Sequence, residues 1–89
     1  KGVMIVSDSS DQIKDMIMQK LDRGVTILHG EGGYSGKPKR ILFCVIDRRQ
    51  ISTVRDWVRK IDPDAFVILS EISDVIGYGF KSRHLNMGK

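Results

Sequence analysis

Apolar and polar positions along the chain follow two different periods, and the changes between them mark six elements. Residues 2–7, 25–28, 39–46 and 65–69 are short apolar runs rich in β-branched residues, which predicts four strands. Two longer stretches repeat apolar residues three or four positions apart, which predicts amphipathic helices. The predicted order is strand, helix, strand, strand, helix, strand.

The first helical stretch is expected to run from Ser9 to about Arg23 along one apolar stripe, formed by Ile13, Ile17 and Leu21. Ser9 and Gln12 have the spacing of a capping box, in which each side chain bonds the backbone of the other residue. Gly24 is suited to a left-handed residue that terminates the helix.

The second helical stretch covers residues 51–61, with an apolar stripe formed by Ile51, Val54, Trp57, Val58 and Ile61. Asp47 and Gln50 repeat the capping-box spacing in a weaker form. Pro63 ends the helix because it disfavours helical geometry at Asp62. Residues 73–77 fit one further helical turn, with Ser73 as its cap.

Two successive βαβ halves define the predicted fold. Right-handed crossovers place both helices on one face of a four-stranded antiparallel sheet, which is the ferredoxin-like βαββαβ plait of the α+β class. The unbroken apolar core of residues 39–46 indicates a central strand or burial on both faces. Residues 1–80 are expected to form this single domain, and residues 81–89 a loosely ordered tail.

Composition is that of one globular domain of 89 residues, with 29% charged and 40% hydrophobic residues. No apolar run approaches the ~20 residues of a membrane span, and no signal peptide is visible. The chain begins without Met, so we expect a domain of a longer protein. The lone Cys44 lies in an apolar strand, which predicts a buried core thiol and a reducing, cytoplasmic compartment.

Positive charge is concentrated in the middle of the chain. The formal net charge is +4, and residues 37–60 contain eight lysines and arginines against two aspartates. This asymmetry predicts one positive face that an anionic ligand, a nucleic acid or an anionic membrane surface could use. A face that is simply solvated is the alternative.

A glycine-rich loop between the second and third strands is the main functional candidate. Residues 29–37 hold four of the nine glycines, more than a hairpin turn requires. The segment is not a Walker A motif, because Glu31 replaces its first glycine and Pro38 follows Lys37. It is not a dinucleotide fingerprint either, because Ser35 stands where the third glycine belongs.

We predict a small-ligand site on this loop, which comprises His29, Gly30, Glu31, Gly32, Gly33, Tyr34, Ser35, Gly36, Lys37 and the nearby Arg40. The amides of its glycines would surround an anion, and the two cations would offset the charge. The aromatic ring of Tyr34 would pack on a planar group of the ligand. The alternative is a mobile hairpin loop without a ligand.

Catalysis and metal binding are not expected. His29 and Glu31 share one side of a strand end, but two ligands do not make a metal site, and His84 lies in the tail. The sequence contains no Ser-His-Asp pattern, zinc motif or catalytic carboxylate pair, so we expect no enzyme activity and no cofactor.

Five short segments carry a resemblance to a known family: residues 23–26 (RGVT), 29–36 (HGEGGYSG), 48–50 (RRQ), 61–66 (IDPDAF) and 75–80 (VIGYGF). The chain resembles the C-terminal cytoplasmic domain, of unknown function, of bacterial YitT-type multi-pass membrane proteins. The resemblance implies a ferredoxin-like domain that follows a membrane-embedded portion, with no established enzyme activity.

A looser similarity connects the chain with PII-like and ACT-like regulatory domains, whose oligomers bind small ligands at subunit boundaries. Gly32, Gly33 and Tyr34 are similar to the Gly-Gly-aromatic element of PII-like nucleotide receptors. We therefore expect a regulatory module on the cytoplasmic face of the membrane that binds an anionic metabolite or nucleotide. The alternative is an assembly module of the membrane protein without a ligand.

Apolar strand residues predict a homo-oligomer, either a dimer or a trimer, that packs through the sheet; they are Val25, Ile27, Phe43, Val45, Val67 and Leu69. Nucleic-acid binding ranks third, because it needs aromatic side chains on the exposed sheet face. Phe43 and Phe66 are instead expected inside apolar strand cores.

Overall fold

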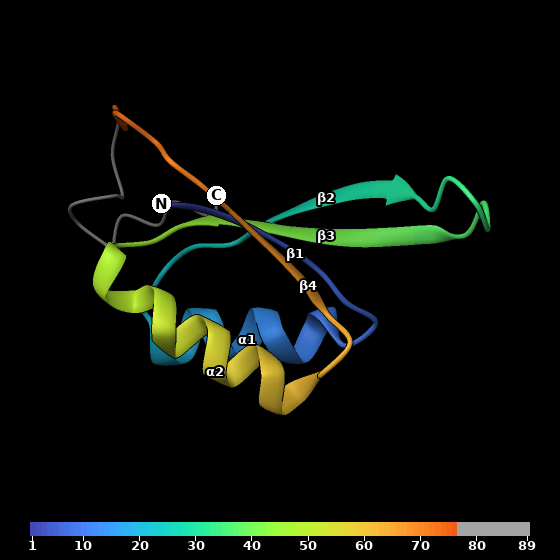
Figure 1. The fold of residues 1–89 in the computed structure, drawn as a ribbon, viewed down its shortest axis with the longest axis horizontal. Coiled ribbons are helices and arrows are strands. Elements are labelled where there is room, and N and C mark those ends of the chain that lie inside the picture. The colour runs from blue at the N-terminus through green and yellow to red at the C-terminus, as the bar shows by residue number, and fades with distance from the viewer. Residues whose placement is uncertain (77–89) are drawn as a thin grey trace.

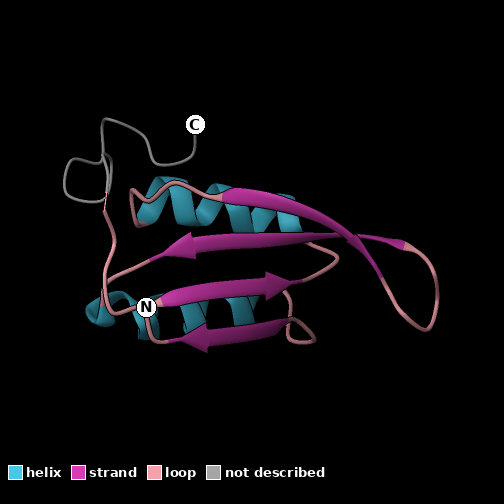
Figure 2. Cartoon of the chain, turned by 90° about the horizontal axis from the view of Figure 1, so that it is seen from above, coloured by secondary structure: helices cyan, strands magenta, loops and turns pink. Residues whose placement is uncertain are grey.

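Both helices lie on the same face of a four-stranded antiparallel sheet (Figures 1 and 2). The computed structural model describes residues 1–76. Its elements are β1 (Gly2–Val6), α1 (Ser10–Lys20), β2 (Thr26–Glu31), β3 (Pro38–Val45), a 3-10 turn η1 (Arg48–Gln50), α2 (Ile51–Ile61) and β4 (Phe66–Ser70). The predicted fold class, element order and placement of both helices are confirmed.

The strand order is β2-β3-β1-β4, and every neighbouring pair is antiparallel. Ile5 in β1 lies opposite Leu42 in β3 and Val67 in β4. β3 is therefore an inner strand, as predicted. Leu42 and Cys44 are buried, whereas the residues between and beside them are only half-buried, so β3 is buried on one face rather than on both.

The hydrophobic core lies between the sheet and the helices. Its buried members come from every layer of the fold: Val3, Ile5, Ile13, Met16, Ile17, Leu21, Val25, Leu42, Cys44, Ile46, Val54 and Val58. Those of α1 follow the predicted stripe at helical spacing, and those of β1 and β3 alternate along the strands. One contiguous core therefore supports both helices.

The start and end of α1 differ from the prediction. Ser9 is the N-cap, but its side chain makes no capping bond; its amide instead donates to Ser7 Oγ at 2.9 Å. At the other end, the left-handed residue is Asp22, with φ 56°, and not Gly24. Aspartate tolerates this conformation better than most residues. The proposed Ser9–Gln12 capping box and the Gly24 terminator are therefore wrong.

The weaker of the two expected capping boxes is the one that forms. Gln50 Oε1 accepts the amide of Asp47 at 3.0 Å, and the Asp47 side chain accepts the amide of Gln50 in return. Arg23 donates to both side chains, with Nε 3.1 Å from Gln50 Oε1 and Nη2 2.8 Å from Asp47 Oδ2. Gln50 also donates to the carbonyl of Leu21. This network joins the end of α1 to the start of α2.

Two further expectations concern the end of the chain and its charge. Residues 73–76 contain no helical turn, and residue 77 and the tail at 81–89 lie outside the described residues. The expected single positive face is not found. The cations of residues 37–60 are spread over the hairpin, η1 and α2, and the hairpin tip and η1 lie at opposite ends of the molecule (Figure 1).

Cys44 is a core thiol, as predicted. It is buried on the helix side of β3, and this burial raises the pKa of the thiol to about 11, against a smaller lowering effect of Arg23. The thiol of the unfolded chain ionises near pH 8.5. The burial of Cys44 therefore makes its full contribution to stability below that pH, and this contribution is lost as the pH rises towards 11.

We expect the native thiol to react with Ellman's reagent at pH 8 only through unfolding, and to react at once in denaturant. Cys44→Ala should lower the free energy of unfolding by about 1 kcal/mol at pH 7. Between pH 8.5 and 11 the variant should lose less stability than the wild type, because it has no thiol to ionise. Urea titrations followed by the fluorescence of Trp57, the only tryptophan, measure both effects. Rapid native labelling would contradict the assignment.

Candidate functional site

The glycine-rich segment forms the end of the β2–β3 hairpin, which projects beyond the two helices (Figures 1 and 2). His29, Gly30 and Glu31 belong to β2 itself, paired with Arg40, Lys39 and Pro38 of β3. The loop proper is therefore residues 32–37, shorter than the nine-residue segment expected from the sequence.

Internal hydrogen bonds already use most of the loop amides proposed for an anion. Gly32 donates to the carbonyl of Lys37 at 2.9 Å, and Gly36 donates to the carbonyl of Gly32 at 2.8 Å. The amide of Lys37 donates to Ser35 Oγ at 3.2 Å. Gly36 has φ +71°, which explains a glycine at this position without any ligand. An anion could use the Gly32 and Gly36 amides only after these bonds were exchanged.

The side chains of the predicted site are not gathered around one point. Arg40 donates from Nη1 to Asp11 Oδ1 of α1 at 2.7 Å, so its charge is engaged on the helix side. Tyr34 and Lys37 are exposed at the tip. A Cβ on Gly33 would meet no heavy atom within 4 Å, so the structure does not require glycine there. Within residues 1–76, no three potential metal-ligating side chains lie together, and His84 falls outside that range.

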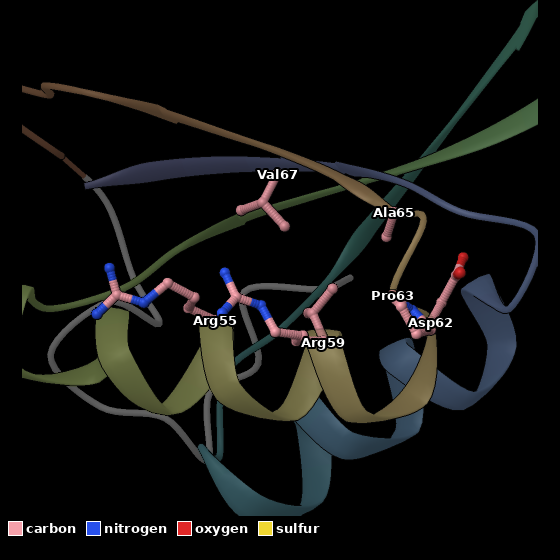
Figure 3. A pocket seen from close by; sticks show the side chains of 7 residues that line it. Arg55, Arg59, Asp62, Pro63, Ala65 and Val67 are labelled. Atoms are coloured by element: carbon pink, nitrogen blue, oxygen red, sulfur yellow. The ribbon is translucent and has the colours of Figure 1, made fainter.

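A cleft between α2 and β4 was not found from the sequence. It has a volume of about 260 Å³ and is lined by Arg55, Val58, Arg59, Asp62, Pro63, Ala65 and Val67. Val67 and Ala65 point from the β4 side towards the helix (Figure 3). The side chains of Arg55 and Arg59 run parallel to each other along α2. The signal in the sequence that could have indicated this cleft is the spacing of the two arginines, four residues apart on one helix.

Asp62, the C-cap of α2, lines both this cleft and a second one of about 280 Å³, which Lys39 and Phe66 also help to line. Its carboxylate points away from the two arginines (Figure 3). Oδ2 accepts the hydroxyl of Ser7, and Oδ1 accepts the amide of Asp64 at 3.0 Å. These bonds, the Ser7 bond first, hold the pKa of Asp62 below its usual range.

The sheet surface away from the helices is apolar over all four strands. We call it the open face, and the register assigns to it Met4, Val6, Leu28, Ile41, Phe43, Val45, Phe66 and Ile68. Phe66 and Ile68 are 72% and 53% exposed. At one end Ile72 closes over Gly2, where an added Cβ would lie 2.9 Å from Ile72 Cδ1.

The open face corrects two expectations. Phe43 and Phe66 lie on it rather than in the core. The six apolar residues expected to pack copies together divide between the faces: Phe43 and Val45 belong to the open face, whereas Val25, Ile27, Val67 and Leu69 lie on the helix side. Among the described strand positions of the open face, Lys39 alone is charged. A surface with one cation offers little to a nucleic-acid backbone.

Comparisons with known proteins identify the family. Residues 23–77 match the family described as "Uncharacterized protein conserved in bacteria (DUF2179)". A crystal structure of a DUF2179 protein from Eubacterium ventriosum is 38% identical and superimposes with a TM-score of 0.69, covering 78% of this chain and 94% of that one. A functionally unknown protein from Pediococcus pentosaceus, 15% identical with a TM-score of 0.71, shares the fold over 86% of this chain and 94% of that one.

Curated relatives from Bacillus subtilis (strain 168) are named as membrane proteins. UPF0750 membrane protein YpjC is 39% identical over 80 residues, and UPF0750 membrane protein YitT is 29% identical over 75 residues. The alignments cover 90% and 84% of this chain but only 28% and 27% of those proteins. The chain belongs to the DUF2179 family and is a DUF2179 domain of YitT-type membrane proteins. Neither helix in residues 1–76 is long and apolar enough to cross a membrane.

The Ser7–Asp62 hydrogen bond predicts a pH dependence. Because the folded pKa of Asp62 is lowered, the bond favours folding above the unfolded pKa of about 3.9 and loses this effect as the pH falls through the folded value. Ser7→Ala should therefore lower stability more at pH 7 than near pH 2, where only the loss of the Ser9 amide bond to Ser7 Oγ remains. Urea titrations across this range measure the difference, and a difference that is constant with pH would contradict the role of the bond.

Proposed function

We propose that this domain associates with a second copy of itself through the open face of its sheet. On the cytoplasmic side of the membrane it would act as an assembly module of its parent membrane protein. The observation that carries the proposal is the open face itself, where eight apolar side chains lie on the side of the sheet opposite α1 and α2 (Figures 1 and 2). Contiguous apolar patches of roughly a few hundred Å² on a protein surface are often functional.

The chemistry of the open face favours a second copy as its occupant. The single cation of these strand positions, Lys39, lies at the hairpin end. A two-fold axis that lies in the interface and runs across the strands would place the two Lys39 residues at opposite ends, so no like charges would meet. A membrane surface with anionic lipids would instead select a cluster of lysines and arginines around the apolar patch.

The size of the open face predicts weak association of the isolated domain. Four strands about 4.8 Å apart and five residues of about 3.3 Å each give a patch on the order of 300 Å². That is well below the ~800 Å² that each partner contributes to a standard interface. Attachment to a membrane protein would raise the effective concentration and make weak contacts sufficient.

Sedimentation velocity over a concentration series tests the proposal. We expect a concentration-dependent dimer, and we expect Ile68→Lys to weaken it at least about tenfold by placing a charge in an apolar contact. Met18→Lys is the matched control, because Met18 is 49% exposed on α1, on the opposite side of the molecule. It should leave the dimer unchanged, and Trp57 fluorescence verifies that both variants are folded.

Two results would contradict self-association. One is a wild-type chain that stays monomeric at millimolar concentration. The other is a chain of residues 1–76 that dimerises while the 89-residue chain does not, since residues 77–89 would then be the occupant of the face. Equal effects of Ile68→Lys and Met18→Lys would assign the dimer to another surface.

Ligand sensing at the hairpin is the second proposal. Its support is the projecting tip, where Lys37 and Tyr34 are exposed and Lys37 has no ion pair within residues 1–76. In this proposal an anionic metabolite or nucleotide binds residues 29–37 with Arg40 and regulates the membrane protein. The bonds of Gly32, Gly36 and Arg40 would have to be exchanged on binding.

Calorimetric titration with nucleotides and phosphorylated metabolites tests this second function. Lys37→Glu should abolish binding and change stability by less than about 0.5 kcal/mol, because the side chain is exposed. Added salt should weaken binding, because part of the attraction is electrostatic. No binding by the wild-type chain, or equal binding by both chains, would contradict ligand sensing at the loop.

A further inference from the structure

The free edge of β4 is unusual for a natural sheet. β4 pairs with β1 on one side, and no described strand pairs with its other side. Its sequence, FVILS, contains no charge and no proline. Edge strands are normally protected by such residues, because their unpaired amides and carbonyls attract other strands. The opposite edge, β2, carries His29, Gly30 and Glu31.

The cleft below this edge is positively charged. Arg55 and Arg59 line it, and within residues 1–76 neither guanidinium forms an ion pair. Asp62 does not neutralise them, because its carboxylate points the other way and accepts the Ser7 hydroxyl (Figure 3). The floor of the cleft is apolar, formed by Val58, Ala65 and Val67.

We propose that the free edge of β4 binds an extended acidic peptide as a fifth strand of the sheet. Main-chain hydrogen bonds to β4 would supply affinity, as in other cases of strand addition. Residues four apart on a helix are separated by about 6 Å along its axis, and alternate residues of a strand by about 6.6 Å. Acidic residues at alternate positions of the added strand therefore match Arg55 and Arg59.

The other side of the added strand specifies the rest of the peptide. Successive side chains of a strand point to opposite faces, so the residues between the acidic ones would lie beside Phe66 and Ile68 on the open face. Both of these side chains are largely exposed and apolar. The preferred peptide therefore alternates acidic and apolar residues.

Charge excludes a second copy as the partner of this edge. Pairing β4 with β4 of another chain would bring two copies of Arg55 and Arg59 to the same seam, and like charges would oppose it. An acidic peptide instead neutralises this pair. The peptide site shares only Phe66 and Ile68 with the open face, and its acidic half lies on the helix side, so binding does not require self-association.

The probe is the peptide acetyl-Thr-Val-Glu-Val-Glu-Val-Thr-amide with a fluorescent label, titrated with the 89-residue chain and followed by anisotropy. We expect saturable binding that weakens with salt and falls at least about tenfold in Arg59→Glu. Lys37→Glu makes the same change of charge at the distant hairpin tip and should bind as the wild type does. Leu28→Lys places the charge on the open face at the opposite edge strand, β2, and, if monomeric, tests whether peptide binding is independent of dimer formation.

Peptide controls separate strand addition from simple charge attraction. N-methylation of the valine between the two glutamates, or of the second glutamate, removes an amide proton from one edge of the added strand or the other, so one of these two peptides should lose binding. A peptide of the same composition with adjacent glutamates should bind at least about tenfold more weakly. The proposal would be overturned if the control peptides bound as tightly as the probe. It would also be overturned if inorganic phosphate, at the same concentration as the peptide, displaced it, or if the probe did not bind at millimolar protein.

Discussion

The right-handed connections between the strands place both helices on one face of the sheet, and this constraint determines which face forms the core and which face stays uncovered by helices. Right-handed crossovers after β1 and β3 lead to the same side, so α1 and α2 can cover only that side. The strands nevertheless carry apolar residues on both faces. One face becomes the core around Ile5 and Leu42, and the other becomes the open face. The proposed assembly function follows from this imbalance.

Elements and core could be predicted because their signals are local. The periods of the apolar residues identify both helices and all four strands, and Cys44 within an apolar run is buried as expected. The helix ends were less predictable. Asp47 and Gln50 form their capping box together with Arg23, a residue 24 positions from Asp47, and this contact cannot be inferred from spacing along the helix. Ser9 and Gln12 have equally good spacing but lack such a partner.

The candidate sites depend on contacts between distant segments, which the sequence does not reveal. The sequence identified the glycine-rich loop, but it does not show that hydrogen bonds within the turn engage the amides of Gly32 and Gly36. Nor does it show that Arg40 pairs with Asp11 of α1. The spacing of Arg55 and Arg59 was visible in the sequence. The sequence did not show that these arginines lie beside a free sheet edge, because it does not reveal that β4 is an edge strand. Phe43 and Phe66 were misplaced since an apolar run does not indicate which face a ring occupies.

The most direct test of the open face is an isotope-filtered NMR experiment on a mixture of labelled and unlabelled chains at a concentration where the dimer forms. The account predicts intermolecular contacts from the methyl groups of Met4, Ile41 and Ile68 to the ring of Phe43 on the other copy. Contacts confined to side chains of α1 and α2, or none at all in a sample that is demonstrably dimeric, would contradict it.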